Sequence, residues 1–375
     1  MEETIFDLKE GALVFASNDR EGGGGPKAIV FREWRAEPLD LDSLDLYLDN
    51  SKEITLDINL KIKNSFKFEN GIRTPITKEY SEKISLDFNF ENRIEVFCIV
   101  PGGWLPINIG MTNSRVLGDR NFISRIKQYF LKNDIKQEYR DNLLADFNEM
   151  CVQIDILPYA MEGNENNFLT FEQITQQISE ARTKVNEILP DTPIVQYQDI
   201  ELDCYVKKLI DYLRPTIELR GSFLKNVQSL LLNPSPNIDK IIDKWEKIID
   251  VADQIGISRK DIVVICSLLI ISSPQDDSPI RNVLKPHSEV DSEKVYNALF
   301  DINLIELLLN KSKDFPDKNY VVVTSDKPLV RLASLMVNLK HKQSDGNIST
   351  FTSSIPIKYI GTDERLHTKL NEILS

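Results

Sequence analysis

The segment Tyr320–Leu332, YVVVTSDKPLVRL, decides the fold that we expect for this chain. Its first residues form a short apolar run that is typical of a strand buried in a sheet, and Pro328–Leu339 is expected to be a helix. The segment Arg115–Arg125, RVLGDRNFISR, has the same order of a short apolar strand, an aspartate and a helical pattern, which continues to Leu131. Two segments of this kind predict neighbouring parallel strands in an α/β sheet.

An aspartate follows each of these two strands, Asp119 in the first segment and Asp326 in the second. Because ligands of open α/β sheets bind beyond the carboxyl ends of the strands, the two side chains are expected to project toward one crevice. Another interpretation stays open, since an Asp between a strand and a helix often serves only as the N-cap of that helix. One carboxylate can cap a helix and bind a metal ion, so the two interpretations are compatible.

Two further acidic residues are candidates for the same crevice. The segment Val290–Asn310 predicts a helix whose apolar residues bury one face and leave Asp301 near its edge. Glu162 lies in a loop-like stretch, PYAMEGNENN, in which Glu165 is an alternative candidate. Neither position carries the prediction alone, because a lone acidic residue in a helix or loop is more often simply solvated.

These segments resemble those of PIN-like nuclease domains. In that family a first strand ends in Asp-x-Asn and an apolar helix residue, here Asp119 to Phe122, and a later strand ends in Thr-x-Asp, here Thr324 to Asp326. The family also has an acidic residue in the helix before the later strand and another after the first segment. The resemblance covers about Arg115–Glu165 and Val290–Leu335 and leaves out the N-terminal residues.

The resemblance implies an α/β core, with a parallel sheet flanked by helices, and a metal-dependent nuclease activity. Four carboxylates would bind one or two Mg²⁺ or Mn²⁺ ions: Asp119, Glu162, Asp301 and Asp326. Such an ion would activate a water molecule for in-line attack on a phosphodiester. Asn121 and Thr324 are expected to hydrogen-bond to these carboxylates. Arg120, Lys327 and Arg331 could contact a substrate phosphate or be solvated. The implied enzyme is an endoribonuclease, acting on RNA in preference to DNA, with a stress or antiviral defence role as the expected setting.

The chain is expected to divide near residue 112. Residues 1–112 are predicted to be a β-rich domain with strands at 11–17, 27–35, 54–61, 84–90 and 93–100, and the alternation of Leu with polar residues at Leu39–Asp49 favours another strand. Residues 113–375 are predicted to be the PIN-like domain, with a helical insertion around 170–270 in which residues 202–214 and 222–232 form two of the helical patterns. A further helix is expected at Arg140–Met150, and a surface loop at Ser272–Glu289.

Composition narrows the function classes. The formal net charge of −13 argues against broad, non-specific binding of nucleic acid, although a local basic groove stays compatible with it. The acidic start MEETIFDLKE and the short apolar runs predict a cytoplasmic protein without a signal peptide or membrane span. Four scattered cysteines and three histidines lack the spacing of a zinc site, and the cysteines are expected to be buried thiols. The alternative to the enzyme is a non-catalytic interaction module, and a regulatory protein partner or a homo-oligomer is compatible with either.

Overall fold

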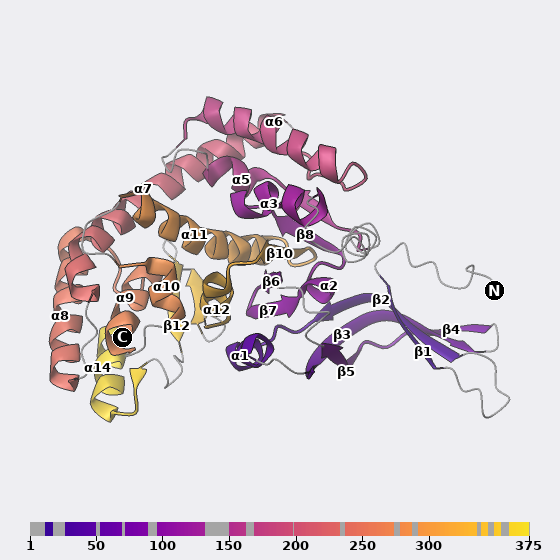
Figure 1. The fold of residues 1–375 in the computed structure, drawn as a ribbon, viewed down its shortest axis with the longest axis horizontal. Coiled ribbons are helices and arrows are strands. Elements are labelled where there is room, and N and C mark those ends of the chain that lie inside the picture. The colour runs from indigo at the N-terminus through magenta and orange to yellow at the C-terminus, as the bar shows by residue number, and fades with distance from the viewer. Residues whose placement is uncertain are drawn as a thin grey trace. The chain divides into compact units, whose positions relative to one another are not determined.

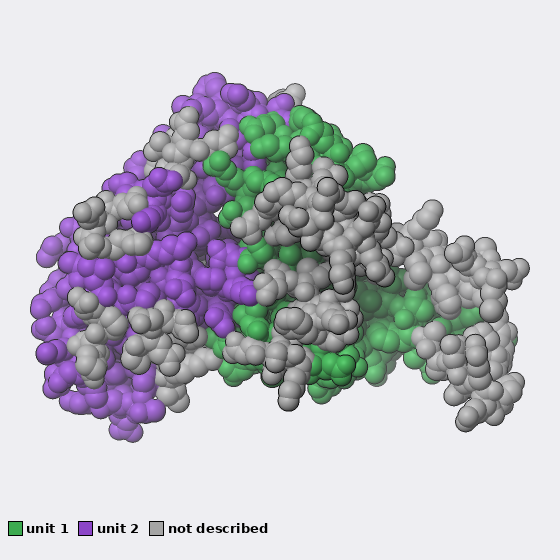
Figure 2. All heavy atoms as spheres, in the orientation of Figure 1, with its two compact units in different colours: residues 1–157, 180–195, 310–325 green, residues 158–179, 196–309, 326–375 purple. Residues whose placement is uncertain are grey.

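The computed structural model forms two compact units, which are coloured separately in Figure 2. Unit 1 comprises residues 1–157, 180–195 and 310–325, and unit 2 comprises residues 158–179, 196–309 and 326–375. The structure describes residues 12–17, 27–49, 53–69, 72–88, 96–131, 150–162, 169–197, 199–232, 237–273, 278–286, 292–335, 339–343, 349–353 and 360–374.

The N-terminal part of unit 1 is an antiparallel sheet with two long strands, β2 and β3 (Figure 1). Its strands are β1 (Leu13–Ser17), β2 (Lys27–Ala36), β3 (Ile54–Glu69), β4 (Ile72–Ile76) and β5 (Tyr80–Phe88). Both β4 and β5 pair with β3, whose residues alternate between buried and exposed from Ile54 to Ile62. This alternation is the period-two pattern that predicts a half-buried strand, and the structure confirms the strands expected in this region.

The segment Leu39–Asp49 is a helix rather than the expected strand. Helix α1 (Leu41–Asp49) begins after Asp40, whose carboxylate accepts a hydrogen bond from the backbone N–H of Ser43 at 2.9 Å. Leu44 and Tyr47 are buried, at a spacing that places them on one face of a helix. The strand prediction was wrong because the leucines of this segment fit both a period of two and a helical period.

A mixed sheet forms the second part of unit 1, in the order β7-β6-β10-β8-β9. Its strands are β6 (Phe97–Val100), β7 (Gly103–Pro106), β8 (Ser114–Leu117), β9 (Gln153–Asp155) and β10 (Asn319–Thr324). Strand β10 pairs in parallel with β8 and antiparallel with β6, and β8 pairs in parallel with β9. The strand expected at 93–100 within the N-terminal sheet is thus β6, a member of this second sheet. Short helix α2 (Ile107–Gly110) follows β7, and α3 (Arg120–Leu131) follows β8.

Unit 2 is mainly helical. Its elements are α5 (Leu157–Glu162), α6 (Phe171–Ile188), α7 (Asp199–Leu231), α8 (Ile238–Ile255), α9 (Ile262–Ser272), α10 (Pro279–Leu284), α11 (Ser292–Asp314), α12 (Lys327–Leu335), β11 (Leu339–Gln343), β12 (Ser349–Ser353) and α14 (Glu364–Leu374), with the ends of α6 and α11 assigned to unit 1. Every residue of α9 is buried, and α7, α8 and α10 pack against it. No helix in the described part of the chain has both the length and the apolar composition needed to cross a bilayer.

Several local expectations differ from the structure, among them the helix expected at Pro328–Leu339, since α12 ends at Leu335 and Leu339 begins β11. The central patterns predicted two helices where α7 runs unbroken through Pro215. The loop expected at Ser272–Glu289 contains α10, in which Ile280 is fully buried. Cys151 and Cys204 are exposed, whereas all four cysteines were expected to be buried. The helix expected at Arg140–Met150 falls, up to residue 149, outside the described residues, as does Glu165.

Candidate functional site

Asp119 lies at the carboxyl end of β8 and is almost completely buried. Its carboxylate Oδ1 accepts a hydrogen bond from the backbone N–H of Phe122 at 2.6 Å, and its backbone carbonyl accepts one from Ile123 at 3.0 Å. Asp119 is therefore the N-cap of α3, and the cap fixes the orientation of the carboxylate at the end of the strand.

The parallel neighbour β10 ends at the same edge of the sheet. Val322 of β10 pairs with Leu117 of β8, so Thr324 stands two residues beyond that pair, level with Asp119. Thr324 is buried. Asp326 follows Thr324 by two residues, and the reach of the chain keeps its Cα within about 7 Å of the Cα of Thr324.

Asp326 caps a helix in the same way as Asp119. Its Oδ1 accepts the backbone N–H of Leu329 at 3.0 Å, and its carbonyl accepts that of Val330 at 3.0 Å, at the start of α12. Asp326 is half-buried and is the first residue of its segment of unit 2. The capping interpretation is thus confirmed for both aspartates, and it leaves a metal-binding role a prediction.

Glu162 and Asp301 both belong to unit 2. Glu162 is the last residue of α5 rather than part of a loop, and its backbone carbonyl accepts a hydrogen bond from the hydroxyl of Tyr296 at 3.3 Å. Burial, with the negative charge of Glu162, raises the pKa of Tyr296 to about 12. Tyr296 precedes Asp301 by five residues on α11, which is about 7.5 Å along the helix axis. The structure therefore brings the end of α5 against the helix that carries Asp301.

Asp155 is a buried acidic residue that the sequence reasoning missed. It ends β9, pairs with Leu117 and accepts the backbone N–H of Leu157 on Oδ1 at 3.1 Å. Lys311 of α11 is also buried; burial lowers the pKa of its ammonium group, and the charge of Asp155 opposes that change. The sequence signal for it is VQIDI (Val152–Ile156), an apolar strand that reaches an aspartate, as in the segments of Asp119 and Asp326.

Some of the residues that could form a metal centre lie at one edge of the mixed sheet. Within unit 1 the strand order places Asp119, Asp155 and Thr324 at neighbouring strand ends, and Asn121 is exposed in the first turn of α3. Carboxylate oxygens suit Mg²⁺ and Mn²⁺. However, among the residues that the structure describes, no three Asp, Glu, His or Cys side chains are grouped so that they could hold a metal ion. The oxygen ligands of these residues fit such an ion, whereas the arrangement of the described side chains does not bring three of them together. Hydrogen bonds from Asn121 and Thr324 to the carboxylates stay a prediction.

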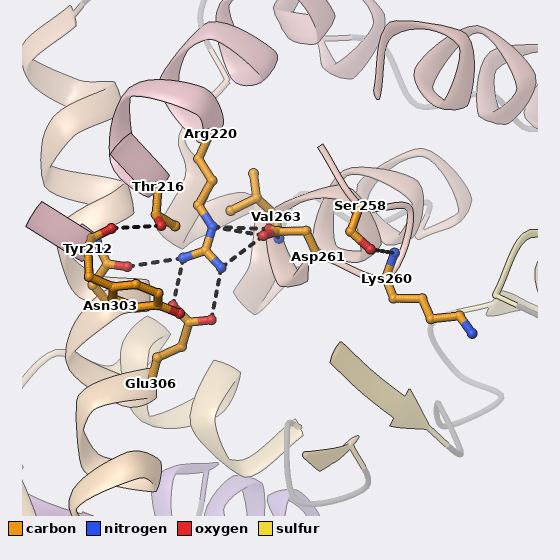
Figure 3. A network of polar contacts seen from close by, with 9 residues as sticks. All are labelled: Tyr212, Thr216, Arg220, Ser258, Lys260, Asp261, Val263, Asn303 and Glu306. Carbon is orange, nitrogen blue, oxygen red and sulfur yellow. Dashed lines mark hydrogen bonds and ion pairs between the residues drawn. The ribbon is translucent and has the colours of Figure 1, made fainter. Parts of the chain in front are cut away.

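A second cluster, which the sequence reasoning also missed, surrounds Arg220 inside unit 2 (Figure 3). The Nε and Nη2 atoms of Arg220 donate to the carboxylate of Asp261 at 3.0–3.1 Å. Its Nη1 and Nη2 atoms donate to the two oxygens of Glu306 at 2.6 and 2.9 Å, and Nη1 also donates to Oδ1 of Asn303 at 3.0 Å. These contacts use all the N–H directions of the guanidinium group.

The Arg220 cluster joins three helices. Asp261 is also the N-cap of α9 and accepts the backbone N–H of Val263, while Asn303 and Glu306 come from α11. Burial by itself would lower the pKa of Arg220, but the two carboxylates outweigh it and raise that pKa; burial raises the pKa of Asp261. A guanidinium group this saturated has no donor left for a substrate, so we assign the cluster a structural role.

No model of a known protein family matches this chain, and no curated protein and no solved structure matches it either. A proposal for the function of this chain therefore starts from the chemistry of the strand-end carboxylates.

Proposed function

We propose that this chain is a metal-dependent endonuclease with a PIN-like α/β core that hydrolyses phosphodiester bonds, in RNA rather than DNA. The observation that supports the proposal is the position of Asp119 at the carboxyl end of β8, beside the parallel strand β10, whose last residue Thr324 precedes Asp326 by two positions. Ligands of α/β sheets bind at this edge. The β-rich N-terminal residues and the helices around 170–270 are additions to that core.

The proposed ligands of Mg²⁺ or Mn²⁺ are the four carboxylates of Asp119, Glu162, Asp301 and Asp326. When bound, such an ion would generate the attacking hydroxide and stabilise the charge that develops on the phosphate. The protein's own contribution is to hold the carboxylates in place. The amide groups at the starts of α3 and α12 do this for Asp119 and Asp326, each through one oxygen.

Basic side chains next to the two caps would contact the substrate backbone. Arg120 follows Asp119 directly, and Lys327 and Arg331 follow Asp326 in α12; all three are half-buried. Lys and Arg near helix N-termini favour a phosphate group, because the amide groups there also carry a partial positive charge. The acidic chain would thus bind nucleic acid through a few local contacts rather than a broad basic surface.

The test is cleavage of end-labelled single-stranded RNA and DNA with Mg²⁺ or Mn²⁺ by the full chain and by Asp119→Asn and Asp326→Asn. Asparagine still caps a helix, so both variants should fold, while losing a charged metal ligand. We expect cleavage to fall by at least about 100-fold in each. Asp363→Asn is the matched control, since Asp363 is a half-buried aspartate that accepts the N–H of Arg365 at the start of α14, and it should cleave like the unaltered chain. Cleavage that survives both substitutions would show that the assignment is wrong.

A non-catalytic interaction module is the second candidate. It is favoured by the lack, among the described side chains, of a three-ligand group for a metal ion. Thermal unfolding with and without millimolar Mn²⁺ separates the two proposals. The nuclease predicts a higher unfolding temperature with the ion, which Asp119→Asn reduces, and an unchanged temperature would favour the interaction module.

A further inference from the structure

The N-terminal sheet has an apolar face that α1 covers only in part. Tyr47 of α1 packs against Phe88 at one end of this face, with ring centroids 5.4 Å apart. At the other end Phe15, Phe31 and Tyr80 form an aromatic row, with centroids 5.2 and 6.2 Å apart, and Phe15 is 40% exposed. This row lines an open cavity of about 700 Å³. Phe31 in the middle of the row is buried, whereas Phe15 is exposed beside the cavity, and an exposed apolar patch on a sheet face is a feature of interaction surfaces.

The cavity reaches the edge strand of the sheet. Four consecutive residues of β5, from Glu82 to Ser85, line it, although their side chains alternate between the two faces, so the cavity lies against the backbone of this strand. Among the described residues, β3 is the sole strand that pairs with β5. Within this described part of the chain the outer edge of β5 has no partner strand, and the backbone N–H and C=O groups along such an edge can bind another strand.

We propose that two copies of this chain associate through β5, in antiparallel orientation, with Ser85 of each copy opposite Ser85 of the other. The proposal is independent of the nuclease activity. Residues that face each other across antiparallel strands lie on the same face of the sheet, so a twofold pairing of β5 with itself allows only a few registers.

Charge favours one of these registers, the one in which opposite charges of β5 face each other. A pairing centred on Glu82 or on Lys83 places like charges directly opposite each other, which is destabilising. The pairing centred on Ser85 instead places Lys83 opposite the partner's Asp87, twice by symmetry. On the other face it places Ile84 opposite the partner's Leu86. The pairs next to the twofold axis are therefore complementary on both faces.

The polar face of the sheet is already arranged in such cross-strand pairs. Lys83 forms an ion pair with Asp57 of β3 at 2.6 Å, and Asp87 accepts a hydrogen bond from Thr55 at 2.6 Å. The second copy would continue these rows across the edge. On the apolar face the same register places the partner's Phe88 opposite Glu82, at the rim of the cavity, where it would cover part of the aromatic row.

Disulfide crosslinking tests the register. Opposite residues in antiparallel strands have Cα atoms about 4.5–5.5 Å apart, within the disulfide range. In full-length protein with Cys151 and Cys204 replaced by serine, Ser85→Cys should form a crosslinked dimer on oxidation with oxidised glutathione. Ser81→Cys is the matched control, on the same face of the same strand but far from its symmetry mate in this register. Equal crosslinking of both variants, or none of either, would overturn the proposal.

Charge exchange tests the same contact without oxidation. Sedimentation velocity should show a dimer of twice the 43.0 kDa chain mass for the unaltered protein. Lys83→Glu and Asp87→Lys should each weaken that dimer, by roughly tenfold, and the double variant should restore it. Lys247→Glu, which alters an exposed ion pair with Asp243 within α8, should leave it unchanged. A chain that stays monomeric, or a double variant no better than the singles, would contradict pairing through β5.

Discussion

Arg220 and Asp261 form a buried ion pair, in which Nη2 of the guanidinium group lies 3.0 Å from Oδ2 of the carboxylate. The side chains are only 3% and 6% exposed. Asp261 caps α9, so the pair connects the middle of α7 to the start of a helix that is buried along its whole length. Because Glu306 binds the other side of the guanidinium group, loss of Arg220 would leave the buried carboxylate of Asp261 and the half-buried one of Glu306 without their cation.

The substitution Arg220→Met should destabilise unit 2 by about 3–5 kcal/mol, since an uncompensated charge in the interior is costly. Urea unfolding followed by circular dichroism measures the loss. Arg259→Met is the control, because Arg259 pairs with Asp253 at the surface and should contribute less than about 1 kcal/mol. Similar losses in the two variants would show that burial does not govern the contribution of the pair.

Local sequence patterns predict most of the strands and helices of this chain because burial follows a regular period in them. Strand β3 alternates between buried and exposed residues, and α8 begins at the cap Asn237 and ends at Gly256 in a left-handed conformation. A capping box at the start of α6 is also a local pattern: the Gln173 side chain accepts the backbone N–H of Thr170, and the Thr170 hydroxyl accepts the backbone N–H of Gln173. The pattern is ambiguous at Leu39–Asp49, where two periods fit the same leucines.

The substitution Gly110→Ala should destabilise unit 1. A Cβ at this position would lie 2.3 Å from Cβ of Cys98, so α2 and β6 would have to move apart. We expect a loss of about 1–3 kcal/mol in urea unfolding. Gly221→Ala is the matched control, because its Cβ would meet nothing closer than 3.7 Å, and alanine within α7 should raise stability slightly. A Gly110→Ala protein as stable as the unaltered chain would contradict this close packing.

Tyr296 should ionise at a higher pH than an ordinary tyrosine. Burial raises its pKa from 10.0 to about 12. Its neutral form therefore contributes stability that is fully present below pH 10.0, the value for the unfolded chain, and is lost as the pH rises through about 12. The phenolate absorbance measured during alkaline titration should show that Tyr296→Phe has one tyrosine fewer ionising near pH 12 than the unaltered chain. If the two titration curves differ instead near pH 10.0, the hydroxyl is not shielded.

Two of the four cysteines should react with a thiol reagent in the folded protein. Cys151 and Cys204 are exposed. Cys98 and Cys266 are buried, and burial raises the pKa of both thiols, for Cys266 to about 12, so little of the reactive thiolate forms. Ellman's reagent should therefore modify two thiols before denaturation and four after it. Serine at both exposed positions should abolish the fast reaction, and a residual fast thiol would show that one of the buried pair is accessible.

The sequence alone predicts the candidate site less completely than the fold. Asp119 and Asp326 could be found because each stands in a strand–aspartate–helix segment, and the structure shows that both cap the helix that follows. The Arg220 cluster could not be found, because it depends on residues 41 and 86 positions away in the chain. The local sequence shows only that Arg220 lies three residues after the buried Ile217 and three before the buried Phe223, a spacing that places it on the buried face of the helix. Which acids lie near each other is set by strand order, and no local pattern encodes that order.

The position of β10 at the centre of its sheet has a consequence for biosynthesis. Its partner β8 precedes it by roughly 200 residues, and contacts between such distant parts of a chain form slowly. A ribosome must therefore release residues 114–117 long before it makes residues 319–324, and in that interval the edges of β6 and β8 that β10 will join have no partner strand. A nascent chain stalled before residue 319 would present these edges to chaperones or to other nascent chains, so truncated products should aggregate more readily than the finished protein.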